Sequence, residues 1–123
     1  MENNNLEFKK EFKNRLYRFV LRLLKFISAL PKNEITKVII NQLIRSGTSI
    51  LANYIEALAS SSKREFINFF QYCLKSANES KMWLTLLRDT NNGNKKEIND
   101  LLKELTEISN IFASAIINLK GKK

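Results

Sequence analysis

The chain contains no histidine and only one cysteine among its 123 residues. Catalytic triads, histidine acid–base relays and His/Cys zinc sites therefore lack the residues that would build them. The single Cys73 cannot form an intrachain disulfide, which is typical of a reducing compartment, and we interpret it as a small core residue. We expect a protein that is not an enzyme and that uses no metal or cofactor.

Long apolar runs, proline and glycine are also scarce. One proline and three glycines leave few breaks for a β-fold with many turns. The longest uncharged run, residues 108–119, is shorter than the roughly 18 residues of a membrane span, and the polar N-terminus lacks the apolar stretch of a signal peptide. We expect a soluble, cytoplasmic, all-α protein with a single domain over residues 1–123.

Three breaks divide the chain, at Pro31, at the serines 60–62 and at the Asn-Gly segment 91–94. They predict four helices, over about residues 6–29, 34–59, 63–89 and 95–119. Asn33, Ser62 and Asn94 stand where N-caps are expected. Helices of similar length joined by short loops favour an antiparallel up-down-up-down four-helix bundle.

Apolar spacing predicts which faces are buried. Helix 6–29 has one stripe, at Phe8, Phe12, Leu16, Phe19, Leu23, Ile27 and Leu30. Helix 95–119 has another, at Ile98, Leu101, Leu105, Ile108, Phe112, Ala115 and Leu119. Helix 34–59 has two apolar sides, the first with Ile39, Leu43, Ile50 and Ala57, the second with Ile40, Ile44, Leu51, Ile55 and Leu58. One stripe suffices for a bundle helix, so the second side predicts self-association into a closed cyclic homo-oligomer.

Positive charge dominates the chain, with 21 Lys plus Arg against 12 Asp plus Glu and a net charge of +9. A basic ridge is expected on the outer face of helix 6–29, at Arg15, Arg18, Arg22 and Lys25, and a basic tail at Lys120, Lys122 and Lys123. Such a surface favours binding to nucleic-acid phosphates with little sequence specificity, because no base-reading motif is present. The alternatives are a protein-interaction adaptor, attraction to anionic membranes, and charges that only keep the protein soluble.

Two sets of polar residues recur at helical spacing. The first comprises Arg45, Ser49, Asn53 and Glu56, in which Arg45 and Glu56 have the charges to pair. The second comprises Tyr72, Ser76, Glu79 and Trp83. We interpret them as a polar network between helices or subunits that fixes register, with a ligand groove as the alternative.

The segment 42–57, QLIRSGTSILANYIEA, resembles the signature of the bacterial four-helix-bundle family that includes the 23S ribosomal RNA intervening-sequence proteins. The resemblance continues through Ser62-Lys63, Phe66 and segment 74–84, LKSANESKMWL, and Pro31 stands at the family's first turn. It implies a left-handed bundle that forms a ring, commonly a pentamer. It also implies kinship with the accessory variability determinant of diversity-generating retroelements, a basic ring that binds nucleic acid and a reverse transcriptase. The family-like positions are Arg45, Ser49, Asn53, Glu56, Glu79 and Trp83.

Overall fold

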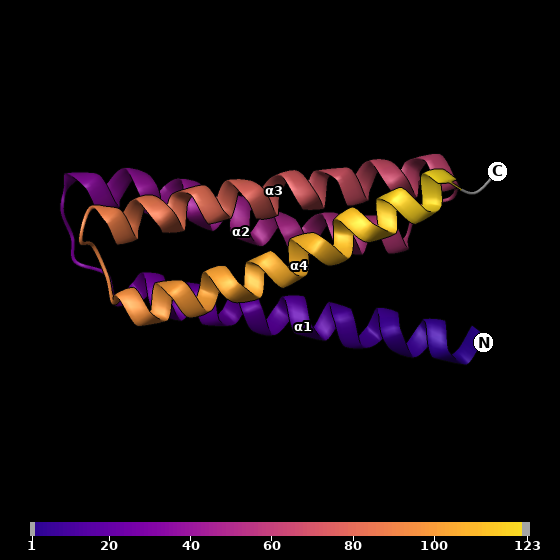
Figure 1. The fold of residues 1–123 in the computed structure, drawn as a ribbon, viewed down its shortest axis with the longest axis horizontal. Coiled ribbons are helices and arrows are strands. Elements are labelled where there is room, and N and C mark those ends of the chain that lie inside the picture. The colour runs from indigo at the N-terminus through magenta and orange to yellow at the C-terminus, as the bar shows by residue number, and fades with distance from the viewer. Residues whose placement is uncertain (1, 122–123) are drawn as a thin grey trace.

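The computed structural model describes residues 2–121, with side chains from residue 5. These residues form four helices and no strand, namely α1 (Glu2–Ser28), α2 (Glu34–Leu58), α3 (Lys63–Asp89) and α4 (Lys95–Gly121). Figure 1 shows the helices lying lengthwise beside one another, with both termini at one end and the α1–α2 and α3–α4 loops at the other. The all-α prediction is confirmed, although α1 begins earlier and α4 extends further than the sequence pattern indicated.

The helix starts are fixed by the expected caps. The Asn33 side chain accepts hydrogen bonds from two backbone N–H groups of the first turn of α2, and the Asn33 backbone N–H donates to Thr36 Oγ1 at 3.0 Å. Ser62 Oγ accepts from the Glu65 N–H at 3.1 Å, and Asn94 Oδ1 accepts from the third backbone N–H beyond it at 2.9 Å. Each cap satisfies donors that a helix start leaves open.

The loop between α3 and α4 packs against the end of α1. Gly93 has φ of +112°, a backbone conformation that favours glycine, and a Cβ at this position would lie 2.8 Å from Leu30 Cδ2 and displace that side chain. The Asn33 side chain donates to Asn92 Oδ1 at 2.9 Å. This contact joins the two loops at the end of the bundle opposite the termini.

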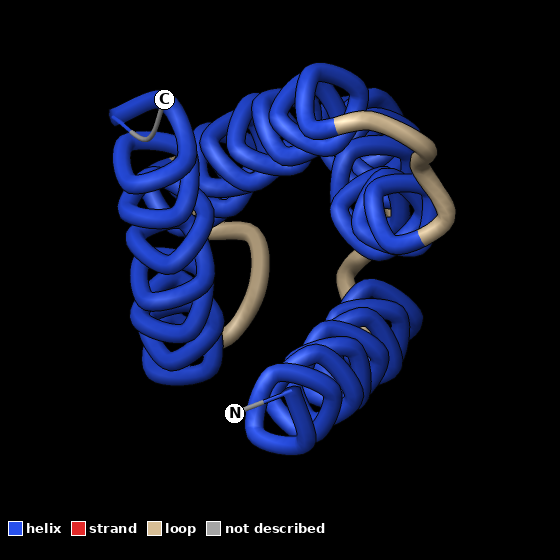
Figure 2. Tube along the Cα trace, turned by 90° about the vertical axis from the view of Figure 1, so that its right-hand side faces the viewer, coloured by secondary structure: helices blue, strands red, loops and turns tan. Residues whose placement is uncertain are grey.

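The predicted seams of α1 and α4 form most of the core, although Ala115 and Leu119 are only half-buried and Phe8 is exposed. Buried members are Phe12, Leu16, Phe19, Leu23, Ile27, Leu30, Ile98, Leu101, Leu105, Ile108 and Phe112. Phe8 was predicted to be buried and is 53% exposed. That prediction is wrong because the N-terminal half of α1 diverges from the C-terminal half of α4, as Figures 1 and 2 show.

The two apolar sides of α2 have different environments. The first side is buried, at Ile39, Leu43, Ile50 and Ala57. The second side is only partly covered, with Ile44, Ile55 and Leu58 exposed by 36%, 43% and 37%. A further exposed row runs along α1, at Tyr17, Leu21 and Leu24. A single chain therefore leaves apolar surface on two adjacent helices.

Within residues 2–121, none of the helices combines the length and the apolar character that crossing a membrane requires.

Candidate nucleic-acid interface

The basic ridge on α1 is partly neutralised by α4. Arg15 donates from Nε to Glu104 Oε2 at 2.8 Å and from Nη2 to Glu104 Oε1 at 2.7 Å, and the same Nη2 lies 3.4 Å from Glu107 Oε1. These hydrogen bonds raise the pKa of Arg15, and those from Arg15 lower the pKa of Glu104. The prediction of a fully solvent-facing ridge is thus wrong for Arg15, which ties α1 to α4.

The other ridge residues remain available to a ligand. The guanidinium of Arg22 lies 3.9 Å from an Asp100 carboxylate oxygen, at the edge of ion-pair distance. Arg18 and Lys25 are exposed, and neither side chain has a hydrogen-bonded or ion-paired partner among residues 5–121. The ridge therefore offers two unpaired cations and one loosely paired cation to solvent.

Three of these arginines surround one small surface cavity. Its volume is about 250 Å³, and it is lined by Arg15, Arg18, Phe19, Arg22 and Glu104. Three guanidinium groups stand against one carboxylate there, so an excess of positive charge remains. Planar guanidinium groups with several donors suit the oxygens of a phosphate.

Lys120 does not join the ridge. It lies sixteen residues beyond Glu104 on α4, roughly 24 Å along the helix axis, and it lines a separate cavity of about 510 Å³ with Arg64 and other residues of α3. Lys122 and Lys123 lie outside the described residues. The ridge and Lys120 are therefore separate basic positions within one chain.

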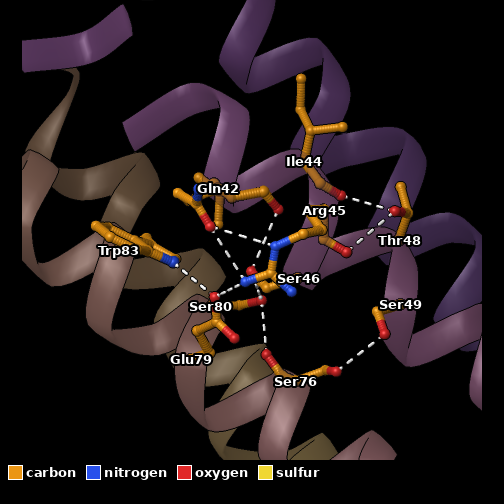
Figure 3. A network of polar contacts seen from close by, with 11 residues as sticks. Gln42, Ile44, Arg45, Ser46, Thr48, Ser49, Ser76, Glu79, Ser80 and Trp83 are labelled. Atoms are coloured by element: carbon orange, nitrogen blue, oxygen red, sulfur yellow. Dashed lines mark hydrogen bonds and ion pairs between the residues drawn. The ribbon is translucent and has the colours of Figure 1, made fainter. Parts of the chain in front are cut away.

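The two polar residue sets come together between α2 and α3, as Figure 3 shows. Arg45 forms an ion pair with Glu79, whose Oε2 also accepts from Trp83 Nε1 at 3.1 Å. Ser76 Oγ donates to Ser49 Oγ at 3.1 Å. Within one chain, these contacts link Arg45 and Ser49 of α2 with Ser76, Glu79 and Trp83 of α3.

Other members of the predicted sets stand apart or act locally. Asn53 donates to Ser49 Oγ at 2.9 Å on its own helix. The expected pairing of Arg45 with Glu56 is wrong, because Glu79 takes the guanidinium and the exposed Glu56 carboxylate has no partner among residues 5–121. Tyr72 is 51% exposed and outside the network.

Sequence reasoning missed the buried centre of this network. The hydroxyls of Ser46 and Ser80 lie 2.8 Å apart, and both residues are fully buried. The available signal was their position one residue from Arg45 and Glu79, which places them on the inner side of the same two helices. Their small side chains allow α2 and α3 to approach closely.

The buried titratable groups offer no activated nucleophile. Burial raises the pKa of Cys73 to about 12, and its Sγ donates to the Ile50 carbonyl at 3.4 Å. Burial likewise raises the pKa of Tyr54 to about 12. The core position predicted for Cys73 is confirmed. In the part of the chain that the structure describes, no cluster of three His, Cys, Asp or Glu residues is arranged to hold a metal ion.

These features define an all-α helical bundle with a basic outer face and a polar seam. A model of the 23S rRNA-intervening sequence protein family matches residues 9–114, and the chain belongs to this family. The fold is similar to a crystal structure described as a protein with unknown function from the S23 ribosomal protein family of Bacteroides thetaiotaomicron. The two are 30% identical, with a TM-score of 0.76 over 88% of this chain and 96% of that one. No curated protein matches the chain.

Proposed function

We propose that the protein is a non-enzymatic oligomer of the cytoplasm that binds RNA or DNA through phosphate contacts, with little sequence specificity. The observation that carries the proposal is the cationic surface of α1, where Arg18, Arg22 and Lys25 face solvent beside the arginine-lined cavity. Neutralising phosphates with such cations releases counterions, a driving force that requires no base-specific contact. The net charge of +9 supports this proposal.

The proposed assembly is a closed ring of antiparallel up-down-up-down subunits, with five copies as the family resemblance implies. The partly exposed second side of α2 and the exposed row on α1 support it, because apolar surface on two adjacent helices is stabilised by burial against another copy. Repetition of the ridge around a ring would let a long polyanion contact several subunits together, which raises apparent affinity. Light scattering coupled to size exclusion should give a mass well above 14.3 kDa, and a monomer at micromolar concentration would contradict the ring.

A salt titration of binding tests the function. Fluorescence polarisation with structured RNA and with duplex DNA should show affinity that falls steeply as salt rises. Exchanging Arg18, Arg22 and Lys25 together for Glu should abolish binding and leave the mass unchanged. Lys37→Glu, an exposed cation at the start of α2, is the single-site control and should change affinity by less than about threefold. Unchanged binding by the triple variant would remove the ridge from the interface.

The second candidate is a protein-interaction adaptor for a nucleic-acid enzyme such as a reverse transcriptase. The exposed apolar residues of α1 and α2 favour it, since they could receive a protein in place of another copy. Salt-insensitive capture of such an enzyme, together with no RNA or DNA binding by the parent at low salt, would establish this alternative.

A further inference from the structure

A groove with an aromatic floor opens where α1 and α4 diverge, at the end of the bundle that holds both termini (Figure 1). Its volume is about 480 Å³, within the range of small-ligand sites. Phe12, Tyr54 and Phe70 form the floor and are 5%, 1% and 7% exposed. We call this site the aromatic groove.

Two aromatic rings at the sides of the aromatic groove remain accessible. Phe8 is 53% exposed and stacks on Phe12, with ring centroids 6.0 Å apart and an interplanar angle of 13°. Phe66 is half-buried, and its ring centroid lies 4.4 Å from that of Phe70. Exposed ring faces of this kind are the surfaces on which bases stack in proteins that bind single strands.

The rim of the aromatic groove is polar and exposed to solvent. Asn5 lies on α1, and Ser114 and Asn118 lie on α4. None of these three side chains has a hydrogen-bond partner among residues 5–121. An amide both donates and accepts, so Asn5 and Asn118 can pair with the edge of a base, whereas an acyl chain offers them no hydrogen-bonding group.

Charge also favours a phosphorylated ligand over a neutral one. Among residues 5–121, Lys9 is the sole charged residue that lines the aromatic groove, and its Nζ lies 6.0 Å from the centroid of the Phe66 ring. The Lys9 carbonyl accepts a hydrogen bond from Tyr54 Oη at 3.2 Å, which holds this turn of α1 in place. A cation beside stacked rings fits a planar base that carries a phosphate.

The aromatic groove and the basic ridge share one side of α1. Phe8 and Arg15 are seven residues apart, two helical turns or roughly 10 Å, and both lie on the side of α1 that faces α4. Two carboxylates lie beside this path, Glu11 on α1 and Glu107 on α4, whose Oε1 lies 3.4 Å from Arg15 Nη2. A strand of a few nucleotides can therefore place a base in the groove and its following phosphates on the ridge.

We infer that the aromatic groove binds an unpaired base of a single-stranded nucleic acid, with the adjoining phosphate at Lys9. The inference rests on the proposed function and adds a preference for single strands to it. Phosphate contacts alone give no such preference, so the two ideas separate experimentally.

The test compares a short fluorescein-labelled oligouridylate with a fully paired RNA duplex that has the same number of phosphates. Phe8→Ala removes an exposed ring and should weaken oligouridylate binding by at least about fivefold while changing duplex binding by less than about twofold. Tyr72→Ala, which removes an equally exposed ring from α3, is the matched control and should change neither affinity. Circular dichroism and the assembled mass verify that both variants fold as the parent does.

Each other outcome overturns the inference. If Phe8→Ala weakens binding of both RNAs equally, or of neither, the inference is overturned. The proposed function still stands in that case, provided that the triple ridge variant loses binding. If the parent binds neither RNA, the proposed function fails, and the side-chain amide NMR signals of Asn5 and Asn118 are then followed with uridine monophosphate and with oleate. A shift with uridine monophosphate alone would make this a site for free nucleotides, a shift with oleate alone a site for acyl chains, and no shift would exclude a site.

Discussion

The α2–α3 pair and the α1–α4 pair are joined in opposite ways. The first is the most extensive helix pair in the fold and the second the least extensive. Between α2 and α3 two facing residues are serines, so the hydroxyls of Ser46 and Ser80 meet directly at 2.8 Å inside the core. Between α1 and α4, Arg15 reaches Glu104 through long side chains, and the helices separate beyond this pair towards the termini.

The two helix pairs differ in how many of their polar side chains are buried and paired within the chain. Close packing excludes water and requires every buried polar group to find a partner, which the α2–α3 seam achieves, since no buried side-chain N or O atom lacks one among residues 5–121. The α1–α4 pair leaves cations, amides and aromatic rings accessible. The buried polar residues of α2–α3 are thus paired within the chain, whereas the α1–α4 side keeps polar side chains without a partner among residues 5–121.

The largest change in the free energy of unfolding is expected for a cavity on the buried face of α3. Leu84 of α3 is 0% exposed, so Leu84→Ala should lower the free energy of unfolding by about 2–5 kcal/mol. Leu86→Ala is the control, because Leu86 is 40% exposed and should lose less than about 1 kcal/mol. Urea denaturation followed by circular dichroism measures both. Similar losses would contradict the close packing of the buried face of α3.

Inserting a large side chain should have different effects on the free energy of unfolding at the α2–α3 pair and at the α1–α4 pair. Ser80→Leu inserts a large group into a fully buried position and should lower the free energy of unfolding by about 1–3 kcal/mol, with the hydroxyl of Ser46 also losing its hydrogen bond to Ser80. Ser114→Leu places the same side chain on the exposed rim of the aromatic groove and should change the free energy of unfolding by less than about 0.5 kcal/mol. Comparable costs at both positions would mean that the α1–α4 side is packed as closely as the α2–α3 side.

Periodicity and turn residues were sufficient to predict the close-packed part of the molecule. Four helices, their caps and the buried side of α2 follow from 3.6-residue spacing and from Asn33, Ser62 and Asn94, because these signals are local in the sequence. The network between Arg45 and Glu79 was predictable only as two polar faces. Which carboxylate pairs with which arginine depends on the packing of two helices.

The α1–α4 side depends on geometry that no local pattern contains. Arg15 and Glu104 are 89 residues apart, so their pairing requires the relative placement of the first and last helices. Phe8 continues the apolar stripe of α1 in the sequence, yet it is exposed because α4 diverges from α1 at that level. The angle between two helices depends on the packing of the whole bundle, and the exposed ring of the aromatic groove follows from that angle.

The smallest change in the free energy of unfolding is expected when the ion pair between α1 and α4 is removed. The side chains of Arg15 and Glu104 are 29% and 25% exposed and share two hydrogen bonds, so Glu104→Gln should lower the free energy of unfolding at neutral pH by about 1 kcal/mol. Glu56→Gln is the control, because the Glu56 carboxylate has no partner within residues 5–121 and its change should lie within about 0.5 kcal/mol.

The pH dependence identifies the charge on Glu104 as the source of that effect. Hydrogen bonding from Arg15 lowers the pKa of Glu104 in the folded chain below its ordinary value of 4.5, so the unfolded chain binds the proton more readily. The stabilisation is therefore complete above pH 4.5 and is lost as the pH falls through the lowered pKa of the folded state. Urea titrations at stepwise lower pH should show the difference between parent and Glu104→Gln shrinking over this acidic range. If the difference in free energy of unfolding stays constant down to the lowest pH at which both proteins fold, it arises from the shape of the side chain. The α1–α4 contact would then not depend on the ionised carboxylate.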